Sequence, residues 1–196
     1  MRKGVKDMNI DMHIYRGRPA DETGRSRNET ACSDFLDGLG IVYDRAAHEE
    51  TDTMEKCAEV KSVLGLHICK NLFLTTRNGK GLYLLLMPGD KQFKTSVVSK
   101  LIGTSRLSFG TPEKMTELIG AAPGSASVLG LMFDRENKVR LVIDRDAVKD
   151  EYFGCHPCRN TSSVKVKTAD LMEKILPALG HEPLIIDIPY QKDGEN

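Results

Sequence analysis

Two polar residues, Lys70 and Asn71, stand near the start of the segment 69–76, whose centre, Leu72-Phe73-Leu74, is apolar. The turn-forming residues 77–80 follow it, and then a second apolar run at 82–87, which is the pattern of a β-hairpin. A lysine at the end of an apolar strand needs either solvent or an anion as its partner. We therefore expect Lys70 to hold an anionic group of a ligand. The alternative is an exposed lysine with no specific role, which is common on protein surfaces.

A run of small residues at 123–127 could place backbone groups against a ligand, because little side chain stands in the way. Such a loop can position a water molecule or a hydroxyl group without a side chain that acts as a base. The competing interpretation is a tight connection between a helix and a strand, which is the more common use of such residues.

The segment Cys155-His156-Pro157-Cys158 invites a zinc or a redox interpretation. A single pair of cysteines lacks the second pair of ligands that a structural zinc site needs, and the other cysteines, Cys32, Cys57 and Cys69, are scattered. A redox pair is expected at the start of a helix, whereas a loop and a strand follow here. We therefore expect no metal, no cofactor and reduced thiols, with His156 as either a functional or a structural histidine.

The first half of the chain alternates helix and strand signals. Ser26 and Glu29 fit a capping box, so a helix is expected over 27–39, with a strand from residue 41 towards His48. Further expected elements are a helix over 52–64, the hairpin at 69–87, a helix at 97–102, a strand at 107–109 and a helix that begins at Pro112.

The second half predicts another hairpin, formed by 128–133 and 139–143, and then one helical turn at 144–148. A loop over 152–161, a strand at 163–166, a helix around 171–176 and a strand at 184–188 complete the series. Hairpins and helices mix without regular βαβ alternation. This favours one α+β domain over residues 26–190, with a mixed, mostly antiparallel, curved sheet, an arm at 1–25 and a tail at 191–196.

Composition limits the range of functions. Lys plus Arg and Asp plus Glu each number 28, so the net charge is zero. This balance argues against a protein that binds nucleic acid over a broad basic surface, but it allows one that touches only the end of a nucleic acid. No apolar run approaches the roughly 20 residues that span a bilayer, and no secretory signal is recognisable. We expect a cytoplasmic protein.

Several ordered motifs resemble the prolyl-tRNA editing family, the free-standing YbaK/ProX relatives of the synthetase editing domain, and its PrdX/ProXp-ala subgroup most. The resemblance covers about residues 14–188 and rests on segments 15–19, 35–41, 48–55, 70–74, 106–109, 123–127 and 156–161. It implies a barrel-like sheet flanked by helices. It also implies hydrolysis of alanine mis-attached to the proline tRNA, in a second sieve that excludes proline.

The resemblance also implies roles for individual residues. Lys70 would hold the phosphate backbone at the tRNA 3′ end, while Asn71 and His156 would orient the terminal adenosine or the aminoacyl group. The loop from Gly124 to Val128 would offer backbone groups to the ester carbonyl and the attacking water, with the terminal ribose hydroxyl assisting. The remaining residues expected to bind substrate are Ser125, Ala126, Ser127 and Asn160, with Leu72, Met54 and Ala58 as walls of the alanine pocket.

One position departs from the family pattern, because Val128 stands where many relatives have proline. Valine leaves φ freer than proline does, so the way this loop positions a carbonyl is an open question. The expected partners are the acceptor end of the tRNA and prolyl-tRNA synthetase. A different class of function would use the same pocket, namely a non-catalytic module that binds aminoacyl-tRNA or regulates proline metabolism.

Overall fold

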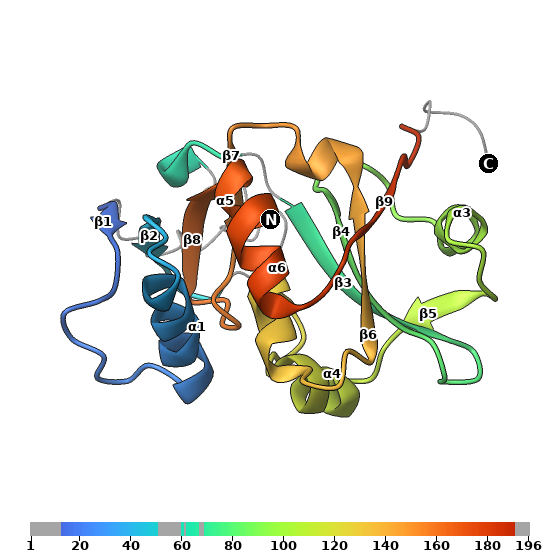
Figure 1. Cartoon of the computed structure of the whole chain (residues 1–196), viewed down its shortest axis with the longest axis horizontal. Coiled ribbons are helices and arrows are strands. Elements are labelled where there is room, and N and C mark those ends of the chain that lie inside the picture. The colour runs from blue at the N-terminus through green and yellow to red at the C-terminus, as the bar shows by residue number, and fades with distance from the viewer. Residues whose placement is uncertain (1–12, 51–59, 61, 67–68, 191–196) are drawn as a thin grey trace, which may run out of the picture.

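The computed structural model describes residues 13–50, 60, 62–66 and 69–190. Two β-sheets lie side by side with helices around them, so the α+β expectation is confirmed (Figure 1). Neither sheet closes on itself within the described segments, so a barrel is not confirmed. No helix in these segments has the length and apolar character needed to cross a membrane.

The larger sheet has the order β5-β3-β4-β6-β9. Strands β3 (Cys69–Thr76) and β4 (Leu82–Pro88) form the expected antiparallel hairpin, and β5 (Leu107–Phe109) pairs antiparallel with β3. Strands β6 (Val139–Asp144) and β9 (Leu184–Ile186) run parallel to β4 on the other side. The strand β4 is buried nearly throughout, in keeping with its central position.

The smaller sheet has the order β1-β2-β8-β7 and is antiparallel throughout. Its strands are β1 (Tyr15–Arg16), β2 (Asp44–Ala47), β7 (Tyr152–Cys155) and β8 (Ser162–Lys167). The strand β7 was expected to be part of a loop. That expectation is wrong, because Phe153 and Cys155 alternate inward into the core while β7 pairs along its length with β8.

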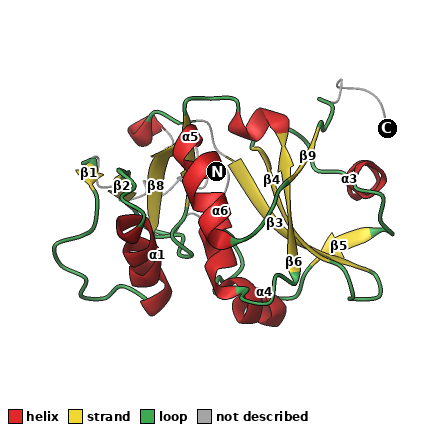
Figure 2. Cartoon of the chain, viewed as in Figure 1, coloured by secondary structure: helices red, strands yellow, loops and turns green. Residues whose placement is uncertain are grey.

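Helices surround the sheets rather than alternating regularly with strands (Figure 2). Those described over their whole length are α1 (Arg27–Gly38), α3 (Thr95–Leu101), α4 (Pro112–Ile119), and a C-terminal helix built from α5 (Thr168–Asp170), the π-helical turn η3 (Leu171–Ile175) and α6 (Leu176–Leu179). Most of the helix expected over 52–64 lies outside the described residues. A short 3₁₀ turn, η2 (Arg145–Val148), follows β6 as expected. The π-helical turn lies just before Pro177, whose ring and missing N–H disturb regular α-helical bonding.

Residues 128–133 do not form the expected strand of a second hairpin. They form the 3₁₀ helix η1 (Val128–Phe133), and β6 pairs with β4 and β9 instead. The Ser127 hydroxyl accepts a hydrogen bond from the Leu129 N–H and so caps this helix. An apolar run of this length fits a buried helix as well as a strand, which is why its pattern misleads.

The main core lies between the two sheets, where α1, α4, η1 and the C-terminal helix also pack. A second cluster covers the opposite face of the larger sheet, against α3 and the segment after β9.

The α1 cap was predicted only in part. Ser26 accepts from the Glu29 N–H, but the Glu29 carboxylate bonds Arg25 and the Ser162 hydroxyl (2.7 Å) instead of the backbone of the cap residue.

Candidate active site

The two polar residues at the start of β3 face opposite sides of the sheet. Side chains alternate along a strand, so Lys70 follows Leu72 and Leu74 towards the second cluster, while Asn71 follows Cys69 and Phe73 towards the main core. The Lys70 Nζ donates a hydrogen bond to the Lys91 carbonyl (2.9 Å). The structure therefore does not bring the Lys70 and Leu72 side chains together with that of Asn71, and Leu72 has a packing role.

The carbonyl that accepts the hydrogen bond from Lys70 belongs to Lys91, whose own side chain makes several contacts. The Lys91 Nζ is buried and contacts Asp144 (2.9 Å), Asp146 (2.8 Å) and the Ile188 carbonyl (2.6 Å). Burial works to lower the pKa of Lys91, but the two carboxylates outweigh it and the pKa rises above its usual value. Lys91 therefore stays charged, and its network fixes the backbone that holds Lys70.

Asn71 has an amide oxygen that is buried without a hydrogen-bond partner among the described residues. Its amide nitrogen lies 3.4 Å from the Cys69 carbonyl. A buried acceptor that lacks a partner is uncommon in native proteins and often marks a place that a ligand or water completes. Asn71 is thus the most direct sign of a binding site on this face of β3.

The small-residue loop meets the β7–β8 loop at Gly124. This glycine is exposed and has a φ of +83°, a conformation that favours glycine. A Cβ atom added here would lie 3.5 Å from the Asn160 Nδ2. Two of the predicted site residues, far apart in the sequence, therefore lie next to each other.

After Gly124 the loop is buried, so Gly124 is its part most open to a ligand. Ser125, Ala126, Ser127 and Val128 all have little or no exposed surface, and the Ser125 N–H already donates to the Ala122 carbonyl. Val128 is the first residue of η1, where proline is favoured because its fixed φ suits a helix start and its missing N–H has no helical partner. Valine can therefore occupy this position without a rearrangement of the helix.

His156 follows β7 directly and is held in one protonation pattern. Its Nδ1 lies 2.8 Å from the Ser162 carbonyl, which can only accept, so Nδ1 carries the proton in the neutral ring. Burial lowers the pKa of His156 to about 4, so the ring is neutral near pH 7. The Nε2 atom then carries a lone pair and can accept a proton or a hydrogen bond from a substrate.

A second histidine, for which no role was predicted, lies beside His156. The ring centroids of His48 and His156 are 5.8 Å apart, and Ser163 contacts both rings. His48 comes at the end of β2, more than a hundred residues earlier in the chain. The register between β2 and β8, which places Ala47 opposite Ser162, is what brings it here, and no local motif signals that pairing.

Comparison with known proteins identifies the family of this chain. The sequence profile of the aminoacyl-tRNA editing domain matches residues 48–174. The chain belongs to the aminoacyl-tRNA editing domain family. The match begins at His48 and contains β3, the 123–127 loop and the β7–β8 loop, so every described residue of the candidate site lies inside the editing domain.

Two relatives of this editing domain have curated names. A "Prolyl-tRNA editing protein ProX" of Acetoanaerobium sticklandii is 29% identical over 146 residues, which cover 74% of this chain and 88% of the relative. A "Prolyl-tRNA synthetase associated domain-containing protein 1" of Xenopus laevis is 30% identical over 156 residues, with 78% of this chain and 92% of the relative covered.

A solved structure described as that of a candidate trans-editing enzyme for prolyl tRNA synthetase has the same fold. Its TM-score is 0.59 at 17% sequence identity, and the match covers 84% of this chain and 99% of the other. At this identity the match supports the fold alone.

Among the described residues, Cys155 and Cys158 do not share a site. Burial raises the pKa of Cys155 to about 12, a shift that the neighbouring Ser127 hydroxyl partly opposes. The Cys158 thiol instead lies 3.7 Å from that of Cys32 on α1. The described residues include no cluster of three or more His, Cys, Asp or Glu side chains suited to a metal ion.

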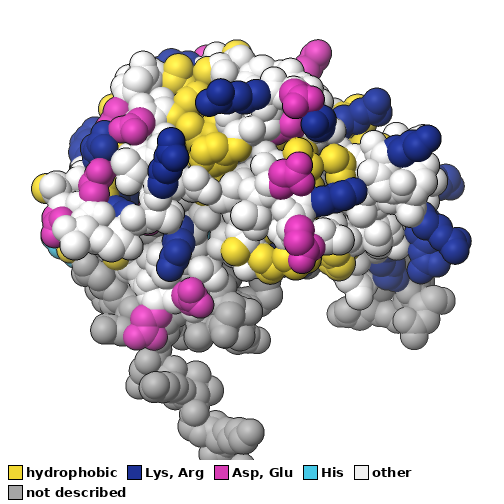
Figure 3. Space-filling view, turned by 90° about the horizontal axis from the view of Figure 1, so that it is seen from below, with side chains coloured by type: hydrophobic (Ala, Val, Ile, Leu, Met, Phe, Trp, Pro, Cys, Tyr) yellow, Lys and Arg dark blue, Asp and Glu magenta, His cyan; other side chains and the backbone are white. Residues whose placement is uncertain are grey.

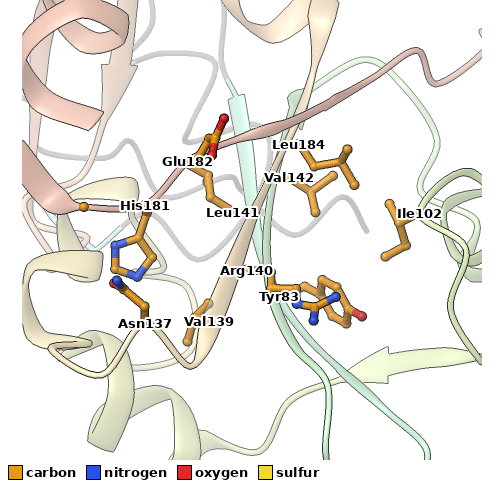
Figure 4. A pocket seen from close by; sticks show the side chains of 11 residues that line it. Tyr83, Ile102, Asn137, Val139, Arg140, Leu141, Val142, His181, Glu182 and Leu184 are labelled. Atoms are coloured by element: carbon orange, nitrogen blue, oxygen red, sulfur yellow. The ribbon is translucent and has the colours of Figure 1, made fainter. Parts of the chain in front are cut away.

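An open pocket of about 300 Å³ lies on the other face of the larger sheet of the editing domain (Figure 4). Tyr83, Ile102, Arg140, Val142 and Leu184 are among the residues that line it. None of the predicted site residues does, so this pocket is separate from the candidate site. Met54 and Ala58, predicted as walls of an alanine pocket, lie outside the described residues.

Proposed function

We propose that this protein is an aminoacyl-tRNA deacylase that acts in trans and hydrolyses the ester of alanine mis-attached to the proline tRNA. Family membership and the names of the relatives support the class of reaction. The observation that carries the proposal is the neutral His156, whose Nε2 can accept a hydrogen bond. The loop that contains His156 also contains Asn160, which lies next to Gly124.

The reaction needs few groups from the protein. Water adds to the ester carbonyl, the bond from that carbon to the ribose oxygen breaks, and the products are free alanine and a ribose hydroxyl. In our proposal the His156 Nε2 accepts a hydrogen bond from a ribose hydroxyl or from the attacking water. The Gly124–Val128 loop, through the backbone N–H of its exposed residue Gly124, bonds the carbonyl oxygen as negative charge develops on it.

Asn71 and Lys70 bind the substrate from two sides of β3 in this proposal. The buried Asn71 oxygen accepts from the substrate, for which the α-ammonium group of the alanyl moiety is a suitable donor. Lys70 exchanges the Lys91 carbonyl for a phosphate near the tRNA 3′ end. The preference for alanine arises from a site too small for proline.

The test is a deacylation assay with the purified protein and alanyl- and prolyl-tRNA for proline. We expect faster loss of the alanyl ester than in buffer and little effect on the prolyl ester. An alanyl ester that decays at the buffer rate contradicts the proposal. Tight binding without turnover favours the alternative, a non-catalytic module that binds aminoacyl-tRNA.

Two lysine variants test the assignment of Lys70. Lys70→Ala should lose most of the activity, because the 3′ phosphate loses a charged partner. Lys138→Ala is the matched control, since this lysine is half exposed and its ion pair with Glu136 lies on the surface. Equal activity in the two variants would show that Lys70 does not bind the substrate, and it would leave the deacylase proposal unaffected.

A further inference from the structure

A continuous chain of hydrogen bonds leads from His48 to His156 through Ser163. The His48 Nδ1 lies 2.8 Å from the Glu49 carbonyl, and its Nε2 lies 3.0 Å from the Ser163 Oγ. The same Oγ lies 3.2 Å from the His156 Nδ1. Ser163 belongs to β8, so the chain joins the end of β2, β8 and the loop after β7.

The carbonyls of Glu49 and Ser162 favour one arrangement of the protons in this chain, and the Ser162 carbonyl also lies near the His48 ring. A carbonyl only accepts, so the His48 Nδ1 must donate to Glu49 and leave its Nε2 as an acceptor. The Ser163 hydroxyl therefore donates to His48, and its oxygen offers a lone pair to the His156 Nδ1–H, which also donates to Ser162. A proton on Nε2 of His156 would leave its Nδ1 lone pair facing the Ser162 carbonyl.

The surroundings keep both rings neutral. His48 is only 7% exposed, and burial lowers its pKa, as it does that of His156. The charged neighbour is Glu29, whose carboxylate is tied to Arg25 and to the Ser162 hydroxyl. Two neutral rings and one hydroxyl form a chain with a single consistent direction, which a protonated His48 would reverse.

We propose that His48 is a positioning residue, which acts through Ser163 to hold His156 with its proton on Nδ1 and its lone pair on Nε2. Its meaning for catalysis rests on the proposed deacylase function. His48 itself need not touch the substrate. Its contribution is to keep the Ser163 hydroxyl turned away from His156, so that Ser163 accepts rather than donates there.

The first experiment uses ¹⁵N spectra of the histidine rings in the protein without substrate. In the wild type we expect His156 as a single neutral form with the proton on Nδ1. In His48→Leu, Ser163 loses its acceptor and can turn its proton towards His156, so the His156 nitrogen shifts should move towards those of a mixture of the two neutral forms. His48→Gln should restore the wild-type pattern, because its amide can donate to Glu49 and accept from Ser163.

The matched control is His181→Leu. His181 is buried to a similar extent and bonds Leu179 and Asp134, so its loss should lower stability without changing the His156 spectrum. A wild-type proton on Nε2 of His156, or an unchanged His156 spectrum in His48→Leu, overturns the proposal.

The second experiment measures deacylation by the same variants. We expect kcat to fall about tenfold in His48→Leu, the effect of one net hydrogen bond, with KM within about twofold. His48→Gln should recover most of kcat, while a loss due to instability alone would track melting temperature and appear in His181→Leu as well. A wild type that does not deacylate rejects the proposed function, and the spectra still decide whether His48 positions His156.

Discussion

Two neutral imidazoles next to each other, His48 buried and His156 half-buried, make the stability of the fold depend on acid. An unfolded chain exposes His48 and His156 to water, where both take up protons near their ordinary pKa of 6.5. The folded protein resists that protonation, because burial disfavours the charged form of each ring. The same feature that keeps His156 ready to accept a proton therefore makes the fold sensitive to pH.

The sign of this effect follows from the lowered pKa of His156. Between about pH 6.5 and pH 4 the unfolded state binds more protons than the folded state, so the stability is present above this window and is lost as the pH falls through it. We expect the wild type to lose about 1–2 kcal/mol more than His156→Gln between about pH 7 and pH 5. Urea unfolding at both pH values measures this difference.

The exposed His13 provides the control for that measurement. His13→Gln should keep the full wild-type dependence on pH, because the mutation leaves the buried pair in place. Equal losses in the wild type and in His156→Gln would show that burial of His156 contributes nothing to acid sensitivity.

At the level of single residues, the sequence indicated the site better than its geometry. Asn71, Gly124, His156 and Asn160 stand out by type in apolar or small-residue surroundings, but only the resemblance to the editing family raised them above an ordinary structural role. The opposite orientations of Lys70 and Asn71 could have been derived from strand alternation alone. His48 could not be assigned, since its role depends on the pairing of β2 with β8 and on the proton preferences of two distant carbonyls.

At the level of elements, strong local signals were reliable and pairing partners were not. The hairpin of β3 and β4, the proline start of α4 and the turn after β6 were all predictable from local patterns. Residues 128–133 were wrongly predicted as a strand because an apolar run fits a strand as well as a buried helix. Such a run also does not reveal whether β6 pairs with a segment close in the sequence or with a distant one. The pairs that β6 forms with β4 and β9 are parallel and need long connections.

The packing of η1 on α4 makes a specific prediction at Gly130. A Cβ atom at this buried position would lie 2.4 Å from the Ile119 carbonyl oxygen and 3.0 Å from the Ile119 Cβ, so the backbone of η1 must move. We expect Gly130→Ala to lower the free energy of unfolding by about 2–3 kcal/mol. Gly38→Ala on α1 is the control, because that site has open space and alanine favours helix.

Thermal and chemical unfolding of both glycine variants measure the difference. A Gly130→Ala protein as stable as Gly38→Ala would mean that η1 can shift away from α4 without cost. Because η1 directly follows the Gly124–Val128 loop, the same shift should also reduce deacylation by displacing that loop.

At the level of the whole molecule, positive and negative charges are balanced in number. Lys plus Arg equals Asp plus Glu, at 28 each. Basic and acidic side chains are interspersed over much of the face shown in Figure 3, with several basic ones near one end. A surface of this kind suits contact with the end of a tRNA more than contact along its helical stem, where many phosphates would have to be neutralised.

The dependence of tRNA binding on salt tests this inference. Each phosphate contact contributes about −0.7 to −0.9 to the slope of log K against log salt concentration, so a contact with two or three phosphates predicts a slope of about −3 or shallower. Binding of uncharged proline tRNA measured over a series of salt concentrations gives the slope, and Lys70→Ala should reduce its magnitude by about 1. A slope near −6 would instead require a basic surface that follows the acceptor stem. Most of the affinity for tRNA would then come from contacts outside the site around His156.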